Sequence, residues 1–89
     1  MSLLQRGCIK SIQRIIKTVD SDKNNPLDVD INYVDIDKTF IIMDASDPTE
    51  NGNSGYVTFN SNTSIKISVV RGSYIHPVIT FCIQVIEFY

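Results

Sequence analysis

Short segments in which apolar and polar residues alternate, separated by turn-forming residues, most constrain what this chain can fold into. Residues 27–34 alternate in this way, and the same period of two recurs in residues 55–59 and 65–70. Residues 39–43 form a short apolar run. A period of two is the pattern of a β-strand with one face in a core and the other in water. These segments therefore predict a series of short strands.

The segment 78–89 is the longest strand candidate, and it is apolar on both faces. One predicted face carries Ile79, Phe81, Ile83 and Val85, and the other carries Val78, Cys82, Ile86 and Phe88. A strand that is apolar on both sides is central in a sandwich or lies in a subunit interface. We therefore expect residues 78–88 to be buried on both faces.

The N-terminal segment is ambiguous from its periodicity. Apolar residues spaced as on a helical stripe face basic and amide residues: Cys8, Ile12, Ile15, Ile16 and Val19 against Lys10, Gln13, Arg14 and Lys17. The richness in isoleucine and the all-β remainder of the chain favour a strand instead. The residue pattern alone leaves both structures open.

Turn-forming residues in the segments 20–26, 46–55, 60–63 and 71–77 separate the predicted strands. About six strands at this spacing predict an all-β fold, a small antiparallel β-sandwich or barrel. We expect residues 9–89 to form this single domain, and residues 1–8 to form an N-terminal arm that reaches a neighbouring subunit or the coat.

The size and charge of the chain narrow its functional class. With 89 residues, it has a core of marginal stability, so a second copy or a larger partner is expected to supplement it. The net charge of −2 combines a basic head, residues 1–19, with an acidic middle, residues 20–50. The acidic balance argues against a nucleic-acid-binding protein. No apolar run approaches the ~20 residues of a membrane span, so no membrane contact is expected.

Residue types that could carry chemistry are sparse. His76 precedes Pro77 and is expected in a loop, and Cys8 and Cys82 are too few for a disulfide scaffold, although a bridge between them stays open. Asp28, Asp30 and Asn32 match half of a calcium loop but lack its later glycine and glutamate. We therefore predict no catalytic residues, no metal and no cofactor.

Three stretches together carry a family resemblance: Ile9-Lys-Ser-Ile-Gln-Arg14, Val34-Asp-Ile-Asp-Lys-Thr-Phe-Ile-Ile42 and Ile83-Gln-Val-Ile-Glu-Phe-Tyr89. In this order the chain resembles a group of small virion proteins of tailed bacteriophages. The glycine that this group has after the arginine is replaced by Ile15, although Arg6 and Gly7 give a second arginine–glycine pair. The resemblance implies an all-β fold and favours a strand over residues 9–18.

The resemblance also implies a function. It predicts a non-enzymatic capsid decoration or cement protein, present in the virion and assembled in the host cytoplasm. The expected partners are further copies of the chain, with a trimer as the expected form, and the major capsid or tail protein. Contacts with these partners are expected at Arg6, Lys10, Arg14, Ile83, Ile86 and Phe88.

Two alternatives remain open. A receptor- or glycan-binding module of a tail fibre or tail tip would present an aromatic groove that includes Tyr56 and Tyr74. A small barrel that binds single-stranded nucleic acid would place Lys10, Arg14 and Lys17 along one groove.

Overall fold

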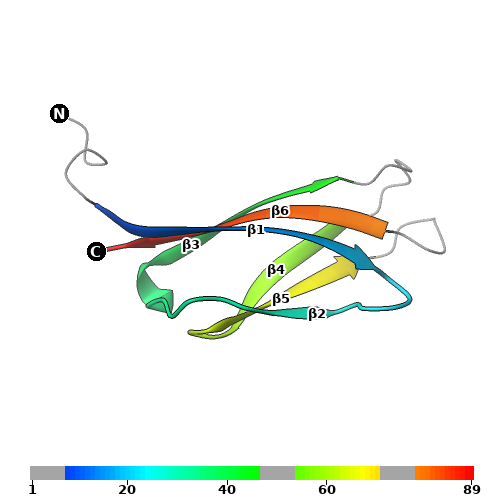
Figure 1. Ribbon diagram of the computed structural model, residues 1–89, viewed down its shortest axis with the longest axis horizontal. Coiled ribbons are helices and arrows are strands. Elements are labelled where there is room, and N and C mark those ends of the chain that lie inside the picture. Colours follow the sequence, from blue (N-terminus) through cyan, green and yellow to red (C-terminus); the bar gives the residue numbers. More distant parts are fainter. Residues whose placement is uncertain (1–7, 47–53, 71–77) are drawn as a thin grey trace.

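A computed structural model describes residues 8–46, 54–70 and 78–89 (Figure 1). Its elements are β1 (Ile9–Asp20), β2 (Leu27–Asp30), the 3-10 turn η2 (Ile36–Lys38), β3 (Thr39–Ser46), β4 (Ser54–Ser61), β5 (Ser64–Val70) and β6 (Val78–Phe88). The predicted all-β class and the number of strands are confirmed.

The strands form two antiparallel sheets that lie face to face. One sheet has the order β1-β6-β3 and the other has the order β2-β5-β4. Figure 1 shows the β1-β6-β3 sheet above the β2-β5-β4 sheet. The sequence left a sandwich and a barrel open, and the described strands form a sandwich of two separate sheets.

The N-terminal segment is a strand over residues 9–20. β1 pairs with β6 in continuous antiparallel register from Ser11 opposite Glu87 to Asp20 opposite Val78. Pairing with a distant strand decides between helix and strand here. Periodicity within the segment cannot reveal that pairing. The strand favoured by the family resemblance is therefore confirmed.

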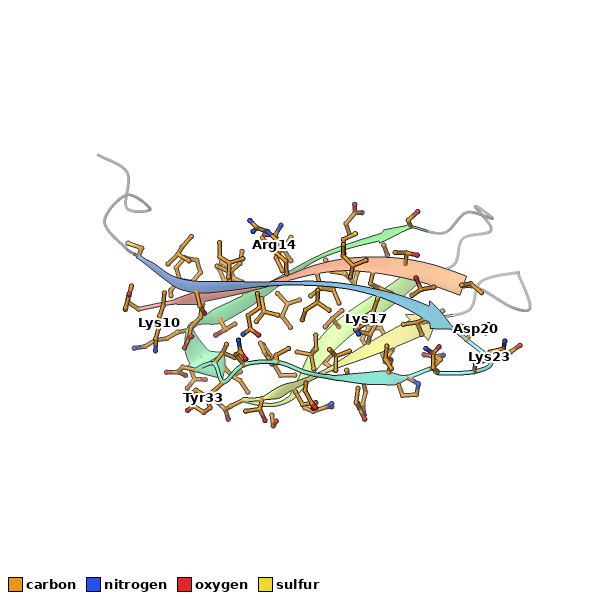
Figure 2. The ribbon with its side chains drawn as sticks, in the orientation of Figure 1. Lys10, Arg14, Lys17, Asp20, Lys23 and Tyr33 are labelled. Atoms are coloured by element: carbon orange, nitrogen blue, oxygen red, sulfur yellow. The ribbon has the colours of Figure 1, made fainter. Side chains whose placement is uncertain are left out.

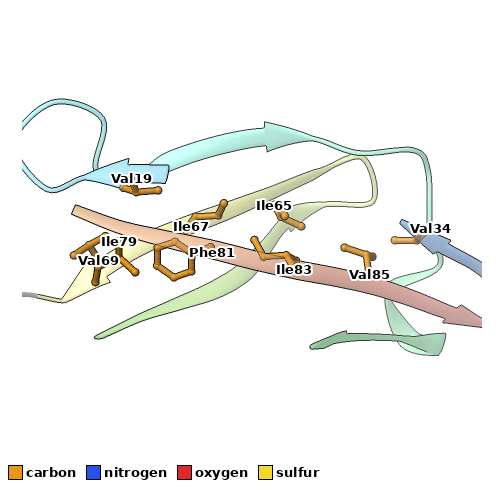
Figure 3. Close-up of a cluster of buried hydrophobic side chains, with 9 residues drawn as sticks. All are labelled: Val19, Val34, Ile65, Ile67, Val69, Ile79, Phe81, Ile83 and Val85. Carbon is orange, nitrogen blue, oxygen red and sulfur yellow. The ribbon is translucent and has the colours of Figure 1, made fainter. Parts of the chain in front are cut away.

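The core lies between the two sheets (Figure 3). It consists of fully or almost fully buried side chains from both layers: Val19, Ile79, Phe81, Ile83 and Val85 from the upper sheet, Ile65, Ile67 and Val69 from the lower sheet, and Val34. The ring of Phe81 lies so close to Gly55 that a Cβ atom there would be 2.3 Å from Cζ of Phe81. The two layers can approach at this point because residue 55 has no side chain.

The expectation that β6 is buried on both faces is wrong for the single chain. Ile79, Phe81, Ile83 and Val85 are at most 1% exposed, but on the other face Cys82 is exposed and Val78 is 38% exposed. Ile86 is buried on that outer face, at 8% exposure. A six-stranded sandwich has one core between its sheets, so the outer face of its central strand has no second layer over it.

The alternation predicted for residues 27–34 ends early. β2 stops at Asp30, and the backbone N–H groups of Ile31 and Val34 then donate to the carbonyl oxygens of Thr63 and Asn62 in the turn between β4 and β5. As the chain turns away, Val34 is fully buried and Tyr33 is 69% exposed, the reverse of the predicted pattern.

Candidate assembly surface

The outer face of the β1-β6-β3 sheet carries most of the exposed apolar side chains of the upper layer. Because antiparallel partners point to the same face, the register arranges them in rows across the three strands. The first row is Ile12, Ile86 and Phe40; the second is Arg14, Gln84 and Ile42; the third is Ile16, Cys82 and Asp44; and the fourth is Thr18, Thr80 and Ser46. We call the first three rows the assembly face.

Large hydrophobic side chains on this face are open to solvent. Ile16 is 71% exposed, Phe40 62%, Ile42 53% and Ile12 42%. Phe40 meets Phe88 edge to face, with ring centroids 5.3 Å apart, which extends the apolar area toward the end of β6. Neighbouring exposed apolar side chains of this kind are typical of surfaces that bind another molecule, which makes this face a candidate site.

The middle of the assembly face is slightly hollow. A shallow depression of about 290 Å3 there is lined by eight residues of the three strands: Arg14, Ile15, Ile16, Ile42, Asp44, Cys82, Ile83 and Gln84. The depression is broad and open, and it holds one cationic and one anionic side chain at its two sides. This shape fits a complementary surface better than a small ligand, which prefers an enclosed pocket.

The outer face of the β2-β5-β4 sheet is polar by contrast. Its exposed side chains include Asp28, Asp30, Thr58 and Asn60, and the amide of Asn60 donates to Asp28 at 2.9 Å. Tyr56 and Val70 are its large exposed hydrophobic residues, at 51% and 46%. The two outer faces of one sandwich thus differ in chemistry, which makes the apolar one the candidate site.

Three of the predicted contact residues lie on or beside this face. Arg14 is exposed there, Ile86 is in its first row, and Phe88 is half-buried against Phe40. Figure 2 shows the Arg14 side chain pointing away from the lower sheet.

The remaining predicted contact residues lie elsewhere. The Ile83 side chain points into the core and is 1% exposed, because odd-numbered residues of β6 face the lower sheet. Lys10 is 3.9 Å from the Glu87 carboxylate. Arg6, most of the predicted arm and the residues Tyr74 and His76 lie outside the described residues.

Four residues of this surface could not be grouped from the sequence: Ile16, Phe40, Ile42 and Asp44. Their alternation marks them as strand residues, but it does not tell which strands are neighbours. Only the pairing of β1 and β3 on either side of β6 brings them together. A signal was present in Phe40 and Ile42, since a strand with large apolar residues on both faces calls for a second contact.

Lys10 of the basic head lies beside the Glu87 carboxylate of the last strand. Glu87 is 3% exposed, and its carboxylate accepts hydrogen bonds from the Ser11 hydroxyl at 3.3 Å and from the Asp35 backbone N–H at 2.9 Å. With Lys10 beside it, this carboxylate joins β1, β6 and the segment before η2. All its described partners belong to the fold, so it has a structural role.

The open possibility of a Cys8–Cys82 bridge is ruled out within one chain. The Tyr89 N–H donates to the Cys8 carbonyl oxygen, whereas Cys82 lies opposite Ile16, eight residues further along β1. At ~3.4 Å per residue, the two cysteines are far beyond the ~7 Å limit for a disulfide. Both thiols are free, and Cys82 is the exposed one.

The described residues also bear on a metal site, a membrane-spanning helix and a basic nucleic-acid-binding groove. They contain no group of three or more His, Cys, Asp or Glu side chains placed to hold a metal, and no helix long and apolar enough to cross a membrane. Arg14 and Lys17 leave β1 on opposite sides (Figure 2), so the basic groove of a nucleic-acid-binding barrel is not formed by these residues.

Comparisons with known proteins add no relative. No family model, no curated protein and no solved structure matches the chain.

Proposed function

We propose that the chain is a non-enzymatic structural protein that works by assembly, and that its contact is the assembly face of the β1-β6-β3 sheet. The single observation that carries this proposal is the apolar character of that face, where four large hydrophobic side chains are 42–71% exposed. Burial of apolar surface is the dominant driving force of association.

The class of assembly that we propose follows from the sequence. Its three matching stretches resemble small virion proteins of tailed phages, so we propose a capsid decoration or cement protein, or a tail-associated component, that joins the particle as a homo-oligomer. A trimer was the form expected from the resemblance. Repetition of a modest contact over a particle lattice would add avidity through effective concentration.

The proposed function is tested on particles. Virions purified from cells that carry the genome encoding this chain should contain it in many copies per particle, as measured by quantitative mass spectrometry. Particles made without its gene should lack the chain in the same measurement, and they should be less resistant to heating. A chain found only in the unassembled fraction of the lysate would contradict the proposal.

The predicted arm is tested in the same assay. A chain without residues 1–7 should fold as the full chain does, because the described contacts begin at Cys8, and should occupy fewer sites when added back to particles that lack the protein. Undiminished occupancy would show that these residues do not reach a neighbour.

A further inference from the structure

The assembly face has a charge pattern that restricts what can cover it. Arg14 on β1 and Asp44 on β3 are both exposed, and they lie on opposite sides of the central strand, one row apart. Within the described part of the chain, neither side chain makes an ion pair or a side-chain hydrogen bond. The face thus offers one cation and one anion, separated by β6, in an otherwise apolar and neutral surface.

This arrangement is complementary to itself under a two-fold rotation. An axis that runs along β6 in the plane of the contact places β1 of one copy over β3 of the other. The first row then brings Ile12 over Phe40, apolar side chain against apolar side chain. Arg14 in the second row of β1 then lies over β3 of the second copy, one row from Asp44 in the third row. The two-fold axis repeats this contact, with Arg14 of the second copy near Asp44 of the first.

The distances suit such a contact. Residues two apart on a strand are separated by ~6.8 Å, a span that an arginine side chain covers. Facing sheets pack ~10 Å apart with a relative rotation of ~30°, so side chains from both layers fill the space between them. Gln84 lies close to the axis, where its amide can both donate to and accept from its counterpart.

We propose that the occupant of the assembly face is a second copy of this chain, packed sheet to sheet about a two-fold axis along β6, with Arg14 of each copy paired to Asp44 of the other. This inference rests on the proposed function, since it names the partner of the same face. It differs from the expected trimer, because a two-fold contact of one face with itself closes at two copies.

The first experiment measures the mass of the purified chain by light scattering with size-exclusion chromatography. The wild-type chain should have twice the monomer mass. Arg14→Glu places a second carboxylate opposite Asp44, and Asp44→Arg places a second guanidinium opposite Arg14, so each variant alone should dissociate at least about ten-fold more readily. Asp30→Arg, the matched change on the polar outer face, should leave the dimer intact.

The decisive experiment combines the two variants. In a mixture of the Arg14→Glu chain and the Asp44→Arg chain, both cross-contacts again join opposite charges, so the heterodimer should form more readily than either variant's homodimer. The double variant should likewise regain the dimer. Circular dichroism of each variant should match the wild type, which separates loss of contact from loss of fold.

Cys82 supplies an independent readout, because β6 runs along the proposed axis and brings the two Cys82 thiols close together. A short bismaleimide should link two wild-type chains, and the link should persist in Cys8→Ser and be lost in Cys82→Ser. A monomer or a trimer by mass, or the absence of rescue in the mixture, would overturn the inference. The particle assay could still support the proposed function in that case, so the two failures are distinguishable.

Discussion

At the scale of single residues, the close approach of the Phe81 ring to Gly55 restricts what residue 55 can be. A Cβ atom at residue 55 would lie 2.3 Å from Cζ of Phe81 and 2.6 Å from the carbonyl oxygen of Ser68. Gly55→Ala is therefore expected to lower the free energy of unfolding by ~1–3 kcal/mol through overpacking. Urea unfolding followed by circular dichroism measures the change.

A second substitution controls this prediction. Thr58 is exposed on the same strand, so Thr58→Ala should change the free energy of unfolding by no more than about 0.5 kcal/mol. In the Gly55→Ala background, Phe81→Leu should cost less than it costs alone, because the smaller side chain relieves the clash. Additive effects of the two substitutions would show that the ring and residue 55 do not compete for space.

The buried carboxylate of Glu87 gives the second residue-scale prediction. Its removal in Glu87→Ala leaves the N–H of Asp35 without its acceptor, and Lys10 loses the carboxylate with which it forms an ion pair. A buried donor without a partner costs ~1–3 kcal/mol, so the midpoint of unfolding should fall correspondingly. Asp30→Ala, on an exposed carboxylate of β2, should leave the midpoint nearly unchanged. Equal effects of the two substitutions would contradict the structural role of Glu87.

The sequence predicted burial of both faces of β6, which is right for the inner face but wrong for Val78 and Cys82 on the outer face, and the alternation of residues 27–34 failed where the backbone leaves the strand. Ile79, Phe81, Ile83 and Val85 are buried as expected. Val34 is buried and Tyr33 is exposed, against the alternation, because the backbone of residues 31–34 is hydrogen-bonded to the turn at residues 62–63. This contact joins distant parts of the chain. To predict the assembly face, one must know which strands pair with β1 and β3, and no local sequence pattern contains that information.

At the scale of elements, the two faces of β5 separate core from surface. Ile67 is fully buried between the sheets, and its neighbour Lys66 points to the outer side. Ile67→Ala should lower the free energy of unfolding by ~2–5 kcal/mol, whereas Lys66→Ala should change it by at most about 0.5 kcal/mol. Chemical denaturation of both variants is the test. A large loss in Lys66→Ala would mean that the assigned register of β5 is wrong.

Side-chain amides hold two elements where backbone pairing stops. The Gln13 side chain accepts from the N–H of Asn32 and donates to its carbonyl oxygen, and Asn25 makes the same pair of bonds with Val69. Each amide thus occupies the place of one residue of a neighbouring strand. The sequence places Gln13 only on a polar stripe, because the backbone group that it binds lies across the sandwich.

At the scale of the whole molecule, the proposed self-association makes stability depend on concentration. A partner that binds only the folded state raises the thermal midpoint by mass action. The Tm of the wild-type chain should therefore rise over a hundred-fold increase in protein concentration. The Tm of the Arg14→Glu variant should stay constant over the same range, as measured by differential scanning calorimetry. A constant Tm for the wild type would argue for a monomer that is stable by itself.

The central position of β6 in its sheet has a consequence for the order of events during synthesis. The strands of the lower sheet all lie within residues 27–70 and can pair while the chain is still growing. β1 must wait for β6, and the ribosome needs roughly 3–12 s to add the 58 residues from Asp20 to Val78 at ~5–20 residues per second. The upper sheet, and with it the assembly face, therefore comes into being only after β6 has left the ribosome. Nascent chains that have not reached that point therefore lack the assembly face.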